Sequence, residues 1–313
     1  MKRFGVQLPA AYQILPESID FVISGFSRWS PPGSQTLSLT KRDCGEWYNQ
    51  FIDRLIGAMG KEYLPVCRMS DGEFLFALGQ QPADIRAPLI LRVTGALLSS
   101  VKKHFCCHGN GFEAESLGHY QSGTYTRSEW DAAQKLYPEL IKHISEKGIL
   151  APHLSYGKKP FQEHYFPAFR KWLDMHTVVL TDSNYIPFYF VYAALTGPRK
   201  QEIFAGRRVL VVNSAKGEKR SAIERGLLRE GVKIVSWCDI SACRSMYDVI
   251  DISRFKEQVD FALVGAGVGK PKILVQMESL QVPCIDAGYV FEVWANSANA
   301  AYRPFCSPDS TKP

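Results

Sequence analysis

Short apolar runs alternate with amphipathic segments along most of this chain. An apolar run that ends at a polar residue or a glycine is typical of a buried strand, and the clearest is Arg208–Asn213. The same pattern predicts strands at 63–67, 178–180, 232–237, 261–264 and 282–286. Helical spacing predicts helices at 47–59, 88–101, 128–144, 185–195, 221–229 and 272–280, and a last one after Gly288. This alternation predicts an α/β fold, with a Rossmann-like, mostly parallel sheet and helices on both faces.

The first part of the chain differs in composition from the rest. Residues 1–43 are rich in proline, glycine and serine, which predicts an irregular N-terminal extension that packs on the domain or meets a partner. No repeat or linker divides residues 44–313, so we expect a single α/β domain there. Within it, residues 107–127 are predicted to form a long loop, and long loops in compact domains are often functional.

The charge of the chain limits the kind of partner it suits. The 313 residues carry a net charge of +6, with 46% hydrophobic and 22% charged residues, which is ordinary for a globular protein. No long run of lysine or arginine occurs, so nucleic acid is not an expected partner. A mild positive balance suits an anionic small ligand, or peripheral contact with an acidic membrane surface.

Cysteine usage and hydropathy favour a cytoplasmic protein. The eight cysteines form no CxxC pair, and Cys67, Cys238 and Cys284 lie in or beside apolar runs, where a free cysteine behaves as a small hydrophobe. The N-terminus lacks the continuous apolar core of a signal peptide, and the most apolar window, 186–195, is too short to span a bilayer. We expect a cytoplasmic location, with association at a membrane surface allowed.

Two carboxylates stand where a short apolar run gives way to a predicted helix. Asp71 and Glu73 flank Gly72, and ligands bind at such strand ends in open α/β sheets. Carboxylate oxygens shared with phosphate oxygens are what Mn²⁺ or Mg²⁺ prefers. We therefore predict that Asp71 and Glu73 hold a divalent metal beside the diphosphate of a sugar nucleotide, with Arg68, Ser70 and Gly72 against the donor.

The same stretch also has a purely structural interpretation. Ser70-Asp71-Gly72-Glu73 matches a capping box, in which the serine caps a helix and the glutamate three residues later returns a hydrogen bond. Acidic residues in a first turn also suit the helix dipole. The spacing alone does not choose between the two interpretations.

Polar residues or glycines follow most of the predicted strands. Because the carboxyl ends of parallel strands meet at one edge of a sheet, we expect these residues to converge on one ligand site. They are Asp71 and Glu73, Asp182, Asn213 and Ser214, the glycines Gly265 and Gly267, and Asp286.

The strongest candidate for an anion site is the segment 213–220. It lies between a strand and a helix predicted to start at a second capping box at 221–224, so backbone amides and the positive end of a helix dipole face it. Lys216, Lys219 and Arg220 add positive charge, and we predict that one or two of them contact a diphosphate. A solvated basic turn is the alternative, and the GxxxxGK[ST] pattern of a P-loop is absent.

A glycine-rich turn follows the predicted strand 261–264. Gly265-Ala266-Gly267-Val268-Gly269 resembles part of a dinucleotide fingerprint, although its spacing is GxGxG and it comes late in the chain. A close approach to a nucleotide and a tight strand-to-helix turn are both compatible with it. An NAD-dependent oxidoreductase is therefore a rival function, because Asp286 lies about 20 positions after the glycines at the end of the next strand.

A last acidic element begins at Asp286. Either Asp286 or Glu292 is a candidate general base that deprotonates an acceptor hydroxyl. The structural alternative is that Asp286 caps the last helix while Glu292 lies on its exposed face.

Taken in order, these segments resemble the GT-D type glycosyltransferases, a bacterial family. The resemblance rests on Arg68-x-Ser70-Asp71-Gly72-Glu73, Thr181-Asp182, the strand and basic turn at 209–220, and Ile285-Asp286-x-Gly288 before Trp294. It implies a Rossmann-like fold, a D-x-E metal motif at Asp71 and Glu73, a nucleotide-sugar donor, and a loop near the donor diphosphate at 216–220.

The chain departs from the family near its last helix. Tyr289 stands where the family has a histidine and Phe291 where it has an aspartate, while Glu292 and Trp294 remain. We expect Tyr289 to lie against the donor. The resemblance implies metal-assisted transfer of a hexose from a UDP-sugar to a glycan, glycoprotein or lipid-linked acceptor in cell-surface glycan biosynthesis. A homo-oligomer is compatible with the sequence. A non-catalytic nucleotide-sugar binding protein is a second rival.

Overall fold

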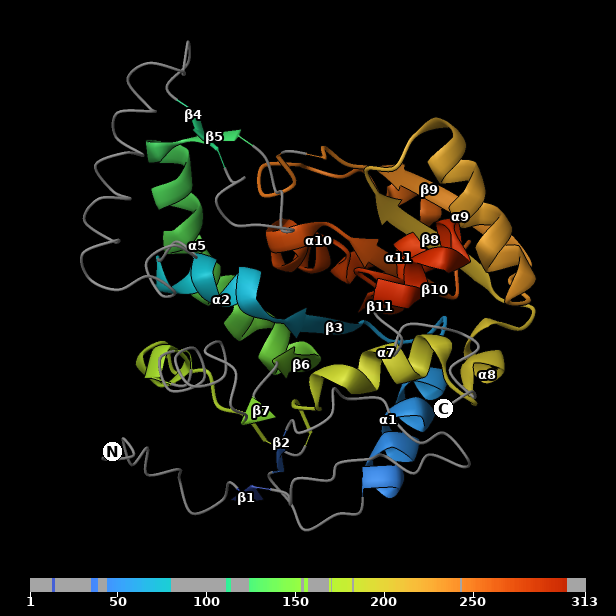
Figure 1. Cartoon of the computed structure of the whole chain (residues 1–313), viewed down its shortest axis with the longest axis horizontal. Helices are drawn as coiled ribbons and strands as arrows, with labels where there is room; N and C mark the ends of the chain where they lie inside the picture. Colours follow the sequence, from blue (N-terminus) through green and yellow to red (C-terminus); the bar gives the residue numbers. More distant parts are fainter. Residues whose placement is uncertain are drawn as a thin grey trace.

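The centre of the molecule is a six-stranded sheet (Figure 1). The structure is a computed structural model that describes residues 13–14, 35–38, 44–79, 111–113, 124–152, 155–156, 169, 171–181, 183–242 and 244–302. In spatial order the strands are β6 (Ile149–Pro152), β3 (Leu64–Met69), β11 (Pro283–Asp286), β10 (Phe261–Gly265), β8 (Arg208–Asn213) and β9 (Ile234–Asp239). Every neighbouring pair is parallel, which confirms the predicted α/β class.

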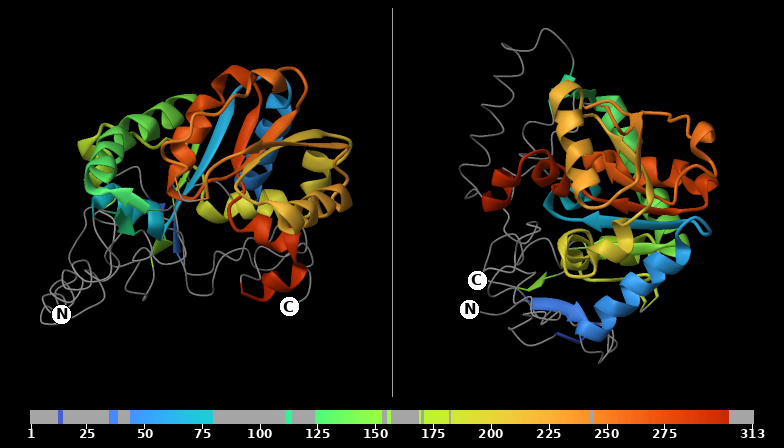
Figure 2. Two further views of the ribbon diagram at one scale, coloured as in Figure 1. Left: turned by 90° about the horizontal axis from the view of Figure 1, so that it is seen from above. Right: turned by 90° about the vertical axis from the view of Figure 1, so that its right-hand side faces the viewer.

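Helices cover both faces of this sheet (Figure 2). The α-helices are α1 (Cys44–Ala58), α2 (Asp71–Leu78), α5 (Arg127–Lys147), α7 (Phe188–Thr196), α8 (Lys200–Phe204), α9 (Gly217–Arg229), α10 (Lys270–Gln276) and α11 (Val290–Ala295). Short 3-10 turns are η2 (Ser253–Phe255), η3 (Gly267–Gly269), η4 (Glu278–Leu280) and η5 (Ser297–Tyr302). The chain runs from β8 through α9 to β9 in one direction and from β10 through α10 to β11 in the other. Since such crossovers are right-handed, α9 and α10 lie on opposite faces.

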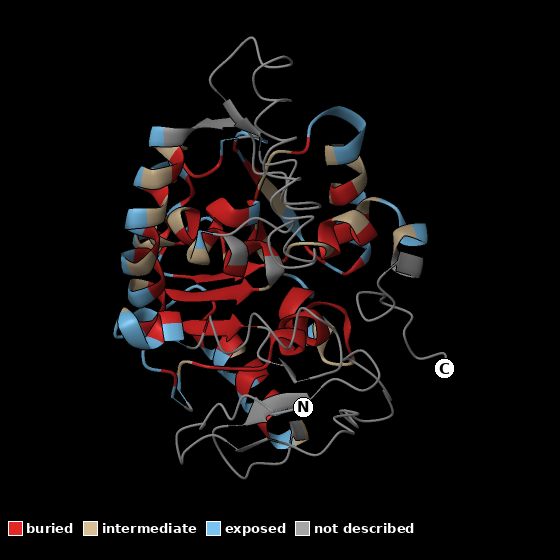
Figure 3. Cartoon of the chain, turned by 60° about the vertical axis from the view of Figure 1, so that its left-hand side comes forward, coloured by how far each residue is buried: buried red, intermediate tan, exposed pale blue. Residues whose placement is uncertain are grey.

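The core follows the strands. β3, β6 and β11 are buried at every position, and Figure 3 shows the central strands as buried between helices whose outer faces are exposed. Strands covered on both faces need side chains that tolerate burial on both sides, which explains the continuous apolar runs in the sequence. Among the described residues, no helix is both long enough and apolar enough to cross a membrane.

Two small antiparallel sheets lie outside the central one. β1 (Gln13–Ile14), β2 (Gln35–Ser38) and β7 (Ser155–Tyr156) form one, and β4 (Gly111–Glu113) with β5 (Thr124–Thr126) forms the other. Part of the predicted N-terminal extension therefore pairs with residues 155–156, and the predicted loop at 107–127 contains two short strands. The proposed domain boundary at residue 43 stays a prediction.

Two predicted elements are wrong. Residues 178–180 form no strand, and the edge strand is instead β6, beside which the chain passes through one bridge between Leu150 and Tyr185. The helix predicted to start at Ser221 begins at Gly217. Ser221 lies inside this helix and does not cap it, since its hydroxyl donates to the Gly217 carbonyl at 3.3 Å. The predicted helix at 88–101 lies outside the described residues.

Candidate functional site

The sheet has its topological switch point between β8 and β10, where the chain direction across the sheet reverses. Asn213 at the end of β8 is in register with Gly265 of β10 on one side and Asp239 of β9 on the other. The Asn213 side chain donates to the Gly265 carbonyl at 3.3 Å and accepts from the Ala215 amide at 2.8 Å. The predicted convergence of the 213 and 265 strand ends is therefore present, at the position where ligands bind in this architecture.

The turn after β8 leads directly into the N-terminus of α9. Lys216 is the N-cap residue, its side chain makes no capping hydrogen bond, and Gly217 follows with φ of +54°. Lys219 in the first turn reaches across to α11, where its ammonium lies 2.6 Å from the Glu292 carboxylate. The start of this 13-residue helix thus combines the positive end of a dipole with two exposed lysines, which suits an anion.

Arg220 lies inside α9 rather than in a loop as predicted. Its guanidinium covers the ring of Trp237 in β9, 4.7 Å from the ring centroid. It also lies 3.2 Å from the Glu224 carboxylate and 3.6 Å from that of Asp239. These contacts place the Arg220 guanidinium beside β9, at the Asp239 end of the row formed by the strand ends.

A buried group of four charged residues lies at the ends of β3 and β11. Its members are Arg68, Glu73, Lys270 and Asp286, each less than a tenth exposed. Asp286 accepts from Arg68 on one oxygen and from Lys270 on the other, both at 2.8 Å. Lys270 also lies 2.9 Å from Glu73. Two positive and two negative charges therefore cancel in a region that water does not reach, which is the arrangement that buried charges require.

The network fixes the charge states of its members. Burial alone would raise the pKa of Asp286, but the charges and hydrogen bonds of Arg68 and Lys270 outweigh it and hold that pKa below its usual range. Burial would likewise lower the pKa of Lys270, and the carboxylates of Asp286 and Glu73 outweigh it and raise that pKa. Asp286 and Lys270 are therefore both ionised at neutral pH.

Gly288 is required by this network. It has φ of +48°, and a Cβ atom there would lie 1.7 Å from the Arg68 guanidinium. The guanidinium also lies over the ring of Tyr192, 4.3 Å from its centroid. Arg68 thus contacts both Gly288 and an aromatic ring, and its Nε donates to the Asp286 carbonyl at 2.9 Å.

Glu73 does not fit a divalent metal in this arrangement. One of its oxygens contacts Lys270, and the other accepts from the Ser70 backbone amide at 2.8 Å, which is the returning bond of the capping box. The ammonium of Lys270 occupies the place between two carboxylates that a cation would take. The side chain of Asp71 lies outside the described residues, and among the described ones no group of three metal-binding side chains is found.

The two candidate bases differ sharply. Asp286 has both oxygens bonded and its pKa lowered, so it does not fit the role of proton acceptor. The side chain of Glu292 is 39% exposed and, within the part of the chain that the structure describes, forms an ion pair with Lys219 alone, so it remains accessible. The hydroxyl of Tyr289 donates to the Asn299 carbonyl in η5. Asp182 lies outside the described residues.

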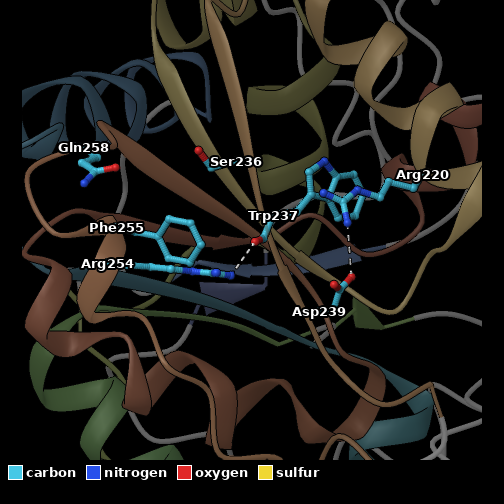
Figure 4. Close-up of a pocket in the computed structure, with 7 residues that line it drawn as sticks. All are labelled: Arg220, Ser236, Trp237, Asp239, Arg254, Phe255 and Gln258. Carbon is cyan, nitrogen blue, oxygen red and sulfur yellow. Dashed lines mark hydrogen bonds and ion pairs between the residues drawn. The ribbon is translucent and has the colours of Figure 1, made fainter.

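An open cavity of about 570 Å³ lies beside the outer edge of β9 (Figure 4). It is lined by Arg220, Ser236, Trp237, Asp239, Arg254, Phe255 and Gln258. The sequence pattern missed Asp239, because the predicted strand ended at residue 237 whereas β9 continues to Asp239, which is the true strand end. It also missed Lys270, whose position at the start of a helix, where a positive charge is unfavourable, was the available signal.

Comparisons with known proteins give limited information. No family model and no curated protein matches the chain. Among solved structures, the selenomethionine-substituted structure of a domain of unknown function 1792 (DUF1792) is 12% identical to it, with 83% of this chain and 87% of that chain covered and a TM-score of 0.43. That likeness carries no argument about function, which is therefore inferred from the site.

Proposed function

We propose that this chain is a glycosyltransferase that takes a hexose from a nucleoside-diphosphate sugar, with a UDP-sugar as the first donor to test. The observation that carries the proposal is the row Asp239, Asn213 and Gly265 at the switch point, beside the N-terminus of α9. Backbone amides and positive charge at such a helix start are suited to a diphosphate. Lys216 and Ser214 belong to the same donor site in this proposal.

The chemistry follows from the charges on this side of the sheet. Negative charge develops on the departing diphosphate, and the first turn of α9 with the ammonium groups of Lys216 and Lys219 would offset it. Glu292 is the accessible carboxylate beside them and would accept the proton of the acceptor hydroxyl. No step is assigned to a metal, because Glu73 is engaged by Lys270 and Ser70.

The two rival functions are weaker on specific grounds. The oxidoreductase needs a free carboxylate after the 265–269 glycines to hold a ribose, and Asp286 has no free oxygen. The binding-protein alternative leaves Glu292 without a role. The acceptor, a glycan, glycoprotein or lipid-linked sugar, is proposed from the family resemblance in the sequence. The cytoplasmic location, with peripheral membrane contact, is proposed from the cysteine usage and net charge.

The first test is a thermal-shift panel with UDP, GDP, CDP, UDP-sugars and NAD(H), each with and without Mn²⁺. A ligand that binds the native state raises the melting temperature by mass action. We expect a shift with one nucleoside diphosphate and its sugar conjugate, and with UDP first. A shift with NAD(H) alone would overturn the proposal in favour of the oxidoreductase.

A substitution at Asp71 tests the metal hypothesis independently of the transferase proposal. If a metal binds through Asp71, Mn²⁺ will enhance the UDP shift in the wild type and the Asp71→Asn variant will lose that enhancement. A wild-type shift that Mn²⁺ leaves unchanged would remove the metal and keep the transferase. Glu73→Gln is a poor substitute test, because it also breaks the buried contact with Lys270.

A further inference from the structure

The cavity beside β9 combines flat cationic surfaces with aromatic support. Arg220 lies over Trp237, and Arg254 lies over Phe255, with the guanidinium carbon 4.6 Å from the ring centroid. Figure 4 shows Arg220, the indole of Trp237 and Asp239 on one side, and Arg254 with Phe255 on the other. Both aromatic residues are buried, whereas Arg254 is exposed and Arg220 is partly exposed, so the two arginines are the more accessible members of these pairs.

These surfaces suit a heterocyclic base. Guanidinium planes and aromatic rings are the groups on which nucleic-acid bases stack, because every base has a π face. The Ser236 hydroxyl and the Gln258 amide line the same cavity and offer hydrogen bonds to a base edge. A volume of about 570 Å³ lies in the range of cavities that hold ligands of nucleoside size.

Asp239 links the cavity to the anion site. It ends β9 and is directly in register with Asn213, so the two residues are one strand spacing apart, about 4.8 Å. In doubly wound folds an acidic residue at the end of the second strand binds ribose hydroxyls while the phosphates lie at the helix after the first strand. Here β8, α9 and β9 are those elements, with the phosphate turn at Lys216 and the acidic residue at Asp239.

We propose that the cavity lined by Arg220, Arg254 and Asp239 is the nucleoside subsite of the donor. The base lies against the two guanidinium groups, the ribose hydroxyls bond to Asp239, and the diphosphate extends over Asn213 to the start of α9. This inference rests on the proposed function, since it assigns the nucleoside half of that donor. It uses none of the residues in the buried network.

The test compares ligands that share the diphosphate but differ in the nucleoside. Calorimetry first measures the binding of UDP, GDP, CDP and ADP to the full wild-type chain. The nucleoside diphosphate that binds most tightly, which we expect to be UDP, is then compared with its 2′-deoxy form and with inorganic pyrophosphate for every variant. Arg254→Ala is expected to weaken UDP roughly tenfold to hundredfold and to leave pyrophosphate unchanged, because Arg254 contacts the base in this proposal and not the phosphates. The variant also loses a positive charge and the hydrogen bond from Arg254 to the Trp237 carbonyl at 3.5 Å. Asp239→Asn is expected to reduce the preference for UDP over 2′-deoxy-UDP.

Arg225→Ala is the matched control. Arg225 is on α9, as Arg220 is, but it is exposed and pairs with Glu218 at 2.5 Å, outside the cavity. It removes the same charge and should leave UDP binding at the wild-type level. Arg254→Lys, which keeps the charge and loses the plane, should resemble Arg254→Ala if stacking is the contact.

The outcomes separate the two proposals. If the wild type binds UDP and both Arg254→Ala and Asp239→Asn bind it equally well, the subsite is wrong and the transferase proposal stands. An equal loss for UDP and pyrophosphate in Arg254→Ala would also overturn the subsite, since the effect would then be on the phosphates. Failure of the wild type to bind any nucleoside diphosphate or sugar conjugate would remove both.

Discussion

The two halves of the sheet's carboxyl edge carry similar charges in opposite surroundings. At the ends of β3 and β11, the four charges of Arg68, Glu73, Lys270 and Asp286 are buried and each meets an opposite charge. At the ends of β8 and β9, Lys216 and Asp239 are exposed, and the ion pair of Lys219 is open to solvent.

Burial decides what each half can do. A buried charge that loses its partner is strongly destabilising. The four residues of the network are therefore needed to bind one another, so they stabilise the fold and are not available to a ligand. An exposed ion pair contributes little to the free energy of folding. Either residue can therefore leave its partner and bind a ligand instead with only a small loss of stability. The ends of β8 and β9 are therefore the part of the edge available for binding.

The largest expected effect is in the buried half. Lys270→Met leaves Glu73 with the Ser70 amide alone and Asp286 with Arg68 alone, so we expect a loss of about 3–5 kcal/mol in the free energy of unfolding. Urea unfolding followed by circular dichroism measures it. Lys272→Met, two residues along the same helix and outside the network, should cost less than about 1 kcal/mol. Equal losses in the free energy of unfolding for the two variants would show that the network does not stabilise the fold.

A pair of glycines tests the same contrast through the backbone. Gly288 and Gly217 both have positive φ, near +50°, but a Cβ at Gly288 meets the Arg68 guanidinium whereas nothing lies within 4 Å at Gly217. Gly217→Ala should therefore cost only the backbone strain, about 1 kcal/mol. Gly288→Ala must also displace Arg68 from Asp286, and we expect roughly 2–4 kcal/mol. Thermal unfolding of the two variants in parallel gives the comparison, and it fails if Gly217→Ala is the more damaging change.

The buried half should also be acid-sensitive. The pKa of Asp286 is lowered in the folded state, so the stabilisation it provides is complete above the ordinary aspartate pKa of about 4 and is lost as pH falls below it toward the folded value. Urea midpoints from pH 5 down to pH 3 should therefore fall. Asp286→Asn should flatten that fall while Asp260, whose pKa is also lowered, remains in both proteins. An unchanged pH profile in Asp286→Asn would contradict the lowered pKa.

The sequence predicts the frame of the fold because each strand is signalled locally. β8 and β10 are continuous apolar runs that end at Asn213 and Gly265, so both the strands and their convergence could be predicted. β6 could not, because its four residues are separated from the preceding helix by Gly148 alone and resemble any short apolar run. The pairing of Lys270 with Glu73 joins residues nearly 200 positions apart, and nothing in the local pattern of either residue specifies it.

The capping box shows the limit of local patterns most directly. Ser70 and Glu73 fit both a helix cap and a metal motif, and the spacing is the same in either case. Only the position of Lys270, set by the packing of α10 against β3 and β10, determines that the Glu73 carboxylate faces an ammonium. The resemblance in sequence spacing therefore predicted the residues of the motif but not the side chains that surround them.

The smallest effect on stability, and the most useful for function, is expected at Lys219. Because its pair with Glu292 is exposed, Lys219→Ala should change the free energy of unfolding by less than about 1 kcal/mol. A hydrogen bond to a charged phosphate is worth about 1.5–3 kcal/mol, so UDP binding should weaken by roughly a factor of ten or more. Glu292→Gln should act in the opposite direction on binding, since it frees Lys219 for the diphosphate, while it abolishes transfer by removing the base. Calorimetry with UDP and a transfer assay distinguish the two variants, and if both lowered UDP affinity equally the ion pair itself, rather than the lysine, would be what the donor requires.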